Sequence, residues 1–282
     1  MIPAPFEYAR AGTVEEAIQL LGSNEDAKII AGGHSLLPLM RLRFARPALV
    51  VDIDRLTDLE YIRDGGDHIE IGALTRMHDL ATSDLVKEAC PLMAYTAGQV
   101  GDPQVRHRGT IGGSVAHSDP ASDPPTTLLA LGATLVVQGP DGTREVAAAD
   151  MFKGIFESDL GPQDVLTAIR VPKTSAGWSY QKFHRRAIDW AIVGVAAVVE
   201  RSNGSIADAR IALTNMGSTA LRATAVEEAL SGADASPDTI LAACGHAAEG
   251  TSPPSDTNGS AEYRQELAKV LVRRAVEEAL AR

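Results

Sequence analysis

The stretch Ala31-Gly32-Gly33-His34-Ser35-Leu36-Leu37-Pro38-Leu39 organises this chain, and a related stretch, Thr110-Ile111-Gly112-Gly113-Ser114, follows later. The first stretch comes directly after the apolar run Lys28-Ile29-Ile30, which is typical of a strand. Paired glycines beside a hydroxyl residue let bare backbone N–H groups approach an anion without a Cβ in the way. A strand, a Gly-Gly-x-Ser turn and the start of a helix would aim those donors at a phosphate. Two such stretches predict binding at the two ends, or the two faces, of a pyrophosphate.

Neither glycine stretch matches a standard nucleotide fingerprint. The dinucleotide pattern G-x-G-x-x-G and the phosphate loop G-x-x-x-x-G-K-[ST] are both absent from these stretches. The residues alone therefore predict a phosphate-bearing cofactor without naming it. The alternative is that both Gly-Gly pairs form tight turns with no ligand.

The composition narrows the class of protein. The 282 residues are 45% hydrophobic and carry a formal net charge of −11, so a sizeable core is expected and nucleic acid is not an expected partner. No apolar run is long enough to span a bilayer, and the first residues lack the features of an export signal. A cytoplasmic location is expected, with association with the inner face of the membrane left open. Cys90 and Cys244 lie in apolar contexts and are expected to be buried free thiols.

The hydrophobic pattern divides the chain into three units. A helix over 14–22, capped by Thr13, alternates with strands over 28–31 and 48–53 and a helix over 35–42, which predicts a small α/β unit over residues 1–55. Residues 56–175 form the second unit. Its expected elements are hairpins around Asp64–Asp67 and Gly139–Gly142, helices within 75–100 and over 125–131, and a closing strand over 165–172.

The third unit, residues 176–282, has a different pattern of expected strands and helices. Three long strands are expected over 178–184, 191–201 and 205–214, followed by helices over 222–230, 237–248 and 261–280. The last helix is expected to present Tyr263, Leu267, Val270 and Leu271 on one apolar face. The pattern predicts an antiparallel sheet backed by helices, which is an α+β layer.

The glycine stretches carry a resemblance to a known family. With Leu37-Pro38 after the first stretch, and Asp119-Pro120 and Asp123 after the second, they resemble the two FAD signatures of the flavoprotein subunits of molybdenum hydroxylases. This is the xanthine dehydrogenase/carbon monoxide dehydrogenase family. The segment from Lys182 to Ala191 resembles a third block of that family, and the resemblance covers nearly the whole chain. It implies a mixed α/β and α+β fold, with a two-subdomain (PCMH-type) FAD-binding fold before an α+β C-terminal domain.

The resemblance also implies which residues bind FAD. The main chain of residues 31–35 would wrap the diphosphate with help from the Ser35 hydroxyl, and residues 110–114 would contact the ribityl and phosphate region. Asp123 would accept a hydrogen bond from a sugar or ribityl hydroxyl, because a carboxylate is an acceptor suited to a polyol. Leu166 would touch the adenine side, Lys182 would lie near the flavin ring or ribityl chain, and Trp190 would lie close to the isoalloxazine. The full implied set is Ala31, Gly32, Gly33, His34, Ser35, Thr110, Ile111, Gly112, Gly113, Ser114, Asp123, Leu166, Lys182 and Trp190.

Four of these residues have a plainer interpretation. Asp123 could cap the following helix, Lys182 could be a solvated strand lysine, and Trp190 could be a core residue. His34 could donate to a phosphate or could be an ordinary loop histidine. No histidine spacing predicts a metal site, and no catalytic residue is assigned to this chain.

The resemblance places the substrate chemistry on other chains. It implies a molybdopterin-binding large subunit and a small subunit with two [2Fe–2S] clusters, assembled with this chain as a dimer of heterotrimers, a heterohexamer. Two cysteines cannot ligate an iron–sulfur cluster, which fits that division. FAD on this chain would pass electrons to an external acceptor, a quinone or another carrier.

The glycine stretches resemble those of aerobic carbon monoxide dehydrogenases, which convert CO and water to CO2, more than those of xanthine dehydrogenases, which typically carry Asn there. The alternatives are the flavoprotein subunit of a related N-heterocycle, aldehyde or aromatic acyl-CoA oxidoreductase, a self-sufficient flavin oxidoreductase, and a module that has kept only the fold.

Overall fold

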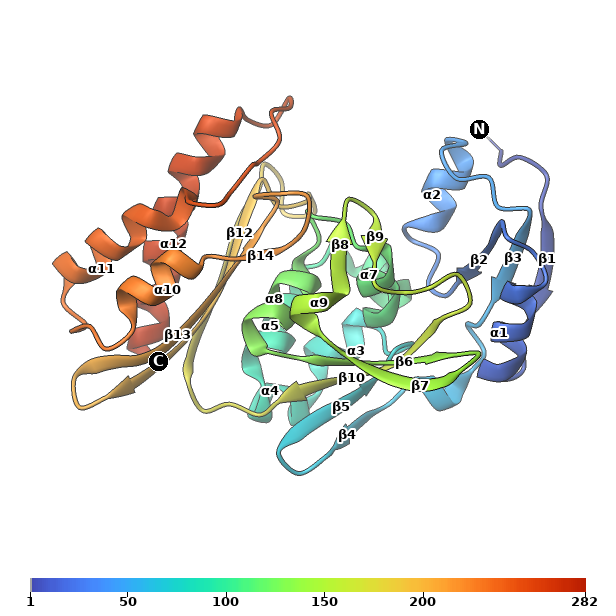
Figure 1. The fold of residues 1–282 in the computed structure, drawn as a ribbon, viewed down its shortest axis with the longest axis horizontal. Helices are drawn as coiled ribbons and strands as arrows, with labels where there is room; N and C mark the ends of the chain where they lie inside the picture. Colours follow the sequence, from blue (N-terminus) through green and yellow to red (C-terminus); the bar gives the residue numbers. More distant parts are fainter. Residues whose placement is uncertain (1) are drawn as a thin grey trace.

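Three sheets, one from each part of the chain, lie next to one another in the computed structural model, which describes residues 2–282 (Figure 1). The first is a parallel sheet of three strands in the order β1-β3-β2. Its elements are β1 (Glu7–Arg10), α1 (Val14–Gly22), β2 (Ala27–Ile30), α2 (Leu36–Arg41), β3 (Leu49–Asp52) and the 3-10 turn η1 (Thr57–Leu59). Strand β1 pairs in register with β3 and was not predicted.

Helix α1 begins and packs as its sequence predicts. The Thr13 hydroxyl accepts the Glu16 N–H at 3.1 Å, and the Glu16 carboxylate accepts the N–H of Gly12 at 2.6 Å. The helix buries Ala17, Ile18 and Leu21 in a core shared with the sheet. An apolar stripe and a capped first turn therefore decide where this helix lies.

The second sheet is antiparallel, with five strands in the order β4-β5-β10-β6-β7. The strand expected to close this unit, β10, lies at the centre of the sheet and joins the two hairpins. The strands of this part are β4 (Ile62–Asp64), β5 (His68–Gly72), β6 (Thr134–Gly139), β7 (Gly142–Ala147), β8 (Phe152–Gly154), β9 (Glu157–Ser158) and β10 (Val165–Pro172). Strands β8 and β9 form a separate short hairpin that was not predicted.

Seven helices accompany the second sheet. They are α3 (Met77–Thr82), α4 (Asp84–Ala89), α5 (Pro91–Gly98), α6 (Pro103–Arg108), α7 (Ile111–His117), α8 (Asp123–Leu131) and α9 (Ala148–Met151). Helices α6, α7 and α9 were not predicted. The second glycine stretch is the first turn of α7, since Thr110 caps that helix. Every residue of α8 is buried, so this helix is at the centre of the molecule.

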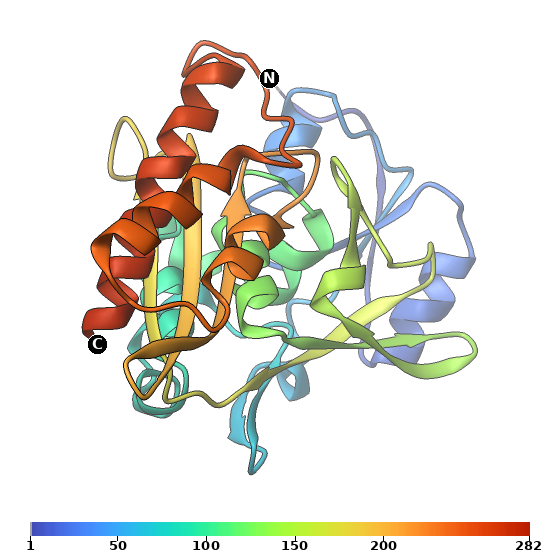
Figure 2. The same ribbon diagram turned by 60° about the vertical axis from the view of Figure 1, so that its left-hand side comes forward.

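The third sheet is antiparallel in the order β11-β12-β13-β14. Its elements are β11 (Gly177–Phe183), β12 (Val193–Ser202), β13 (Ser205–Thr214), β14 (Leu221–Arg222), α10 (Thr224–Leu230), α11 (Pro237–Cys244), the 3-10 turn η2 (Gly245–Ala248) and α12 (Ala261–Ala281). Helices cover both faces of this sheet, where the sequence predicted helices from its own unit only. Helices α10 and α12 cover one face, and α5 and α8 of the second unit cover the other (Figures 1 and 2).

Alternating residues of β12 explain this two-sided burial. Ala196 and Val198 belong to the core that includes α5 and α8, whereas Val195, Ala197 and Val199 belong to the core with α10 and α12. Successive side chains of a strand point to opposite faces, so a strand that is apolar throughout is buried on both.

Helix α12 buries part of the predicted face, since Leu271 is buried and Leu267 packs against the same core. Tyr263 is 47% exposed and Val270 is 41% exposed, whereas Leu271 and Val272 are buried. Arg264 is also buried, and its guanidinium donates to the carbonyl of Ile192 and pairs with Asp256 at 2.7 Å. Tyr263 and Val270 were therefore wrongly assigned to the buried face, and Arg264 is a buried residue that hydrophobicity alone does not predict.

Candidate cofactor site

A cavity of about 920 Å³ lies between the three units. All the predicted cofactor residues line it except Ile111, whose side chain is buried in the core and whose N–H donates to the carbonyl of Thr75. Most of its lining is apolar, and a few polar groups converge on it, as in typical small-molecule sites. The predicted residues that line it are Ala31, Gly32, Gly33, His34, Ser35, Thr110, Gly112, Gly113, Ser114, Asp123, Leu166, Lys182 and Trp190.

The first glycine stretch presents free backbone donors to this cavity. Gly33 has φ +77°, a left-handed conformation that side chains disfavour, and it turns the chain between β2 and α2. The N–H groups of residues 32–35 have no acceptor among residues 2–282. The Ser35 hydroxyl caps no helix N–H, and the exposed His34 sits between these donors. Successive unpaired N–H groups of this kind form an anion-binding concavity.

The second glycine stretch differs, because its N–H groups already have acceptors. The Ile111 N–H donates to Thr75, that of Gly112 to the Ala73 carbonyl at 2.9 Å, and that of Gly113 to the Thr110 hydroxyl at 3.1 Å. The prediction of bare donors here is wrong, since these groups hold the first turn of α7. Contact of this stretch with the cofactor stays a prediction. The glycines, which have no side chain, and the Ser114 hydroxyl would make that contact. This hydroxyl lies 2.8 Å from the Ser122 hydroxyl.

Asp123 and Lys182 form a buried ion pair in the cavity wall. The Lys182 Nζ lies 2.7 Å from Asp123 Oδ2 and 3.0 Å from the carbonyl of Gln99, and both side chains are at most 5% exposed. The Tyr180 hydroxyl donates to Asp123 Oδ1 at 2.6 Å. Burial raises the pKa of the Asp123 carboxyl, while the Lys182 ammonium and the Tyr180 hydroxyl act in the opposite direction. The pair joins α8 of the second unit to β11 of the third.

The plainer interpretations of these two residues are wrong. Ser122 occupies the cap position of α8 and Asp123 is the first helical residue, so Asp123 does not cap the helix. Lys182 is not solvated. The sequence did not predict that the two residues contact each other.

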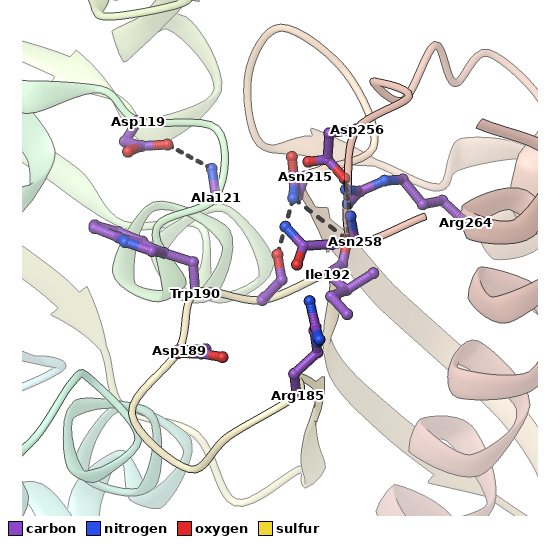
Figure 3. Close-up of a pocket in the computed structure, with 11 residues that line it drawn as sticks. Asp119, Ala121, Arg185, Asp189, Trp190, Ile192, Asn215, Asp256, Asn258 and Arg264 are labelled. Carbon is purple, nitrogen blue, oxygen red and sulfur yellow. Dashed lines mark hydrogen bonds and ion pairs between the residues drawn. The ribbon is translucent and has the colours of Figure 1, made fainter. Parts of the chain in front are cut away.

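Trp190 stands between two cavities. Its side chain is 58% exposed, so it is not a core residue, and it lines the large cavity together with Ile188. It also lines a smaller cavity of about 430 Å³ (Figure 3). In that view Trp190 lies on one side, and the cluster of Asn215, Asp256 and Arg264 lies on the other. The connection from β11 to β12 therefore forms a rim shared by both spaces.

An ion cluster links the first unit to the second beside the cavity. Asp54 lies 2.6 Å from Nη2 of Arg76 and 3.1 Å from Nη2 of Arg108. The Arg76 guanidinium also donates to the Arg108 carbonyl at 2.8 Å. Burial raises the pKa of the Asp54 carboxyl, but the hydrogen bonds and charges of the two arginines outweigh it and leave the pKa below its ordinary value.

The described residues contain no cluster of side chains suited to a metal ion. Within residues 2–282, no group of three His, Cys, Asp or Glu could hold a metal ion, and no helix is long and apolar enough to cross a membrane. Cys90 and Cys244 are free and buried, as predicted. Burial raises the pKa of each thiol to about 12.

Sequence reasoning missed one aromatic wall of the cavity. Phe156, on the unpredicted β8–β9 hairpin, lines the cavity and stacks on His117 with ring centroids 4.9 Å apart. A single Phe in a short hairpin carries no sequence signal. The two turn residues are Ile155 and Phe156, and neither is the Asn or Gly that typically occupies a two-residue turn.

The lining fits FAD on the structure's own features. Unpaired N–H groups suit a pyrophosphate, the apolar and aromatic walls suit flat rings, and the volume suits an extended organic molecule.

Two family models match the chain. The one described as the FAD binding domain in molybdopterin dehydrogenase matches residues 4–174, and the CO dehydrogenase flavoprotein C-terminal domain matches residues 178–279.

Relatives match over the full length. The carbon monoxide dehydrogenase medium chain of Hydrogenophaga pseudoflava is 42% identical over 285 residues, covering 100% of this chain and 99% of that one. The glyceraldehyde dehydrogenase medium chain of Sulfolobus acidocaldarius is 38% identical over 279 residues, with 99% of each chain covered.

A solved structure of the Hydrogenophaga pseudoflava carbon monoxide dehydrogenase, which lacks the Mo-pyranopterin moiety of the molybdenum cofactor, superposes with a TM-score of 0.98. It is 44% identical and covers 100% of this chain and 99% of that one. These matches confirm the family that the glycine stretches predict. The chain belongs to the FAD-binding medium subunits of the molybdenum hydroxylase family, and it is the flavoprotein subunit of an oxidoreductase.

Proposed function

We propose that this chain is the electron-transfer subunit of an aerobic carbon monoxide dehydrogenase. Oxidation of CO with water to CO2 releases two protons and two electrons. In the proposal, a molybdopterin-binding large subunit performs that step, and [2Fe–2S] clusters on a small subunit bring the electrons to this chain. The proposed assembly is a cytoplasmic dimer of heterotrimers. The proposed electron acceptor is a quinone or another external carrier.

The observation that carries the FAD-binding part of the proposal is the row of unpaired N–H groups at residues 32–35, which line a cavity between all three units. When bound, FAD supplies the ability to exchange electrons singly and in pairs. The chain's own residues would hold the diphosphate at this row and fix the polyol near Asp123. The three-part division at residues 1–55, 56–175 and 176–282 is part of the proposal, and the separate sheets support it.

The relatives supply both the favoured substrate and its competitor. A carbon monoxide dehydrogenase medium chain is 42% identical, and a glyceraldehyde dehydrogenase medium chain is 38% identical. The second candidate is therefore the flavoprotein subunit of an aldehyde oxidoreductase. The substrate would be bound on another subunit in either case, so residues of this chain do not decide between them.

Purification of the tagged chain from its native host tests the proposal. We expect stoichiometric FAD, co-purified chains that carry molybdenum and iron, and bleaching of the flavin absorbance by CO under anaerobic conditions. Bleaching by glyceraldehyde and not by CO would move the assignment to the second candidate. A chain that purifies alone and oxidises a substrate without molybdenum or iron would overturn the subunit model.

A further inference from the structure

Phe156 is an aromatic side chain that the structure directs into the cofactor cavity. It lies in the two-residue turn between β8 and β9, is 54% exposed, and lines the large cavity. The other residue of that turn, Ile155, is 60% exposed and does not line the cavity. Of two adjacent apolar side chains, only one therefore presents its surface to the cofactor.

The backbone of Phe156 is held in a conformation that a bulky residue disfavours. Its φ is +60°, in the left-handed region normally taken by Gly, Asn or Asp. The Phe156 N–H donates to the carbonyl of Ser118 at 3.2 Å, and the Ser118 hydroxyl donates to the carbonyl of Glu157 at 2.9 Å. Ser118 itself has φ +53° and ends α7. Disfavoured backbone geometry of this kind persists only where its surroundings enforce it, and it gathers at ligand sites.

His117 supports the ring from behind. The two rings stack at 4.9 Å with an angle of 23° between their planes. Burial lowers the pKa of His117, against the opposing charge of Asp119, so the imidazole is neutral at pH 7. His117 covers one face of the Phe156 ring, and the exposed remainder of the ring borders the cavity.

The position of the Phe156–His117 pair indicates which end of the cofactor the pair would contact. Asp119 follows directly after the end of α7, lies 3.9 Å from His117 Nε2, and lines the smaller cavity together with Trp190. The aromatic pair is thus at the end of the large cavity that borders Trp190. The family resemblance implies that the isoalloxazine lies close to Trp190, and the inference takes this end of the cavity as the end that holds the ring.

We propose that Phe156, supported by His117, is the surface on which the isoalloxazine ring of FAD stacks. The inference rests on the proposed FAD function of this cavity and adds a residue to it. Stacking of a flat heteroaromatic ring on an aromatic side chain contributes enough to change affinity about tenfold.

The test compares Phe156→Ala with the neighbouring Ile155→Ala and the conservative Phe156→Tyr in the full chain. Each is stripped of FAD, checked by thermal unfolding, and titrated with FAD. We expect Phe156→Ala to weaken FAD binding about tenfold and to change the visible spectrum and reduction potential of the bound flavin. Ile155→Ala and Phe156→Tyr should stay within about twofold of the wild type.

Three outcomes separate the possibilities. Unchanged affinity and spectrum in Phe156→Ala would overturn the inference while leaving FAD binding intact. Weaker binding with an unchanged flavin spectrum and potential would place Phe156 against the adenine, and would also overturn it. A wild-type chain that binds no FAD would overturn the proposed function itself.

Discussion

The α-carbon of Gly32 faces the main-chain carbonyl of Arg108 so closely that no side chain fits between them. A Cβ on Gly32 would overlap that oxygen and would lie 2.8 Å from the carbonyl carbon and 3.1 Å from the α-carbon of Gly109. The first glycine stretch is therefore in contact with the segment that leads into the second. The absence of a side chain at Gly32 lets the first and second units of the chain approach each other, whereas Gly33 allows the turn between β2 and α2.

Gly32→Ala should separate these segments, because the obstacle is main chain and cannot rotate away. We expect a loss of stability of about 1–3 kcal/mol and a marked loss of bound FAD. Thermal unfolding and the ratio of flavin to protein absorbance measure both effects. Gly245→Ala is the matched control, since a Cβ there meets nothing within 4 Å. A Gly32→Ala chain with full FAD content and an unchanged melting temperature would contradict this account.

Asp123→Asn should destabilise the chain by about 3–5 kcal/mol, because it leaves the Lys182 ammonium buried without a carboxylate. The double variant Asp123→Asn with Lys182→Met removes the stranded charge, so most of the stability should return. Denaturant unfolding measures the stability, and FAD titration of the double variant shows whether the pair also binds the cofactor.

The exposed pair of Lys173 and Asp64, 2.7 Å apart, provides the comparison for that experiment. Asp64→Asn should cost about 1 kcal/mol or less, since exposed ion pairs contribute little. Equal losses for Asp64→Asn and Asp123→Asn would show that burial does not govern the strength of these pairs.

Asp54 should make stability depend on pH in the acid range. Its folded pKa lies below its unfolded value, so its contribution is present above the unfolded pKa and is lost as the pH falls through the folded pKa, below about 4. Asp54→Asn should lower stability by ~1 kcal/mol at pH 7. The difference from the wild type should shrink as the pH is lowered.

Unfolding of both proteins between pH 7 and pH 3 tests this dependence. Asp58→Asn, at an exposed position without an ion pair in residues 2–282, is the control. A stability gap between wild type and Asp54→Asn that stays constant over this range would contradict the expectation.

The two cysteines should be inert in the folded chain. Cys90 and Cys244 are at most 1% exposed, and burial raises both pKa values to about 12, so little thiolate exists at pH 8. A chromogenic disulfide reagent should report no thiol in the native protein and two after denaturation. Rapid native reaction at either cysteine would show that its surroundings open readily.

Local sequence signals predicted much of this fold. The Thr13 cap, the apolar runs of the strands and the turns at Asp64–Asp67 and Gly139–Gly142 depend on neighbours in the chain, and the structure has elements at these places. Strand β1 was not predicted, because its residues are mostly exposed and no apolar pattern marks it. In helix α12 the prediction was wrong for Tyr263 and Val270. It also missed the buried Arg264, because hydropathy does not register partners such as Ile192 and Asp256.

The site was harder to predict where contacts are distant in sequence. Asp123 and Lys182 are 59 positions apart, and only the folded chain shows that they satisfy each other. Likewise, the N–H groups of Gly112 and Gly113 were expected to be free, yet the acceptors at Ala73 and Thr110 come from tertiary packing and a helix cap. A glycine pattern indicates where the backbone comes close to something, and the fold decides whether that is a ligand or another segment.

The shared burial of α8 also bears on how this gene can be divided or recombined. One face of the sheet built by β11, β12 and β13 is closed by α5 and α8, which belong to an earlier part of the chain. A break in the gene near codon 175 would yield two fragments, each with half of an apolar interface in contact with water. Exchange of the C-terminal part between relatives must therefore preserve the fit to α8, so the two parts are expected to be inherited together.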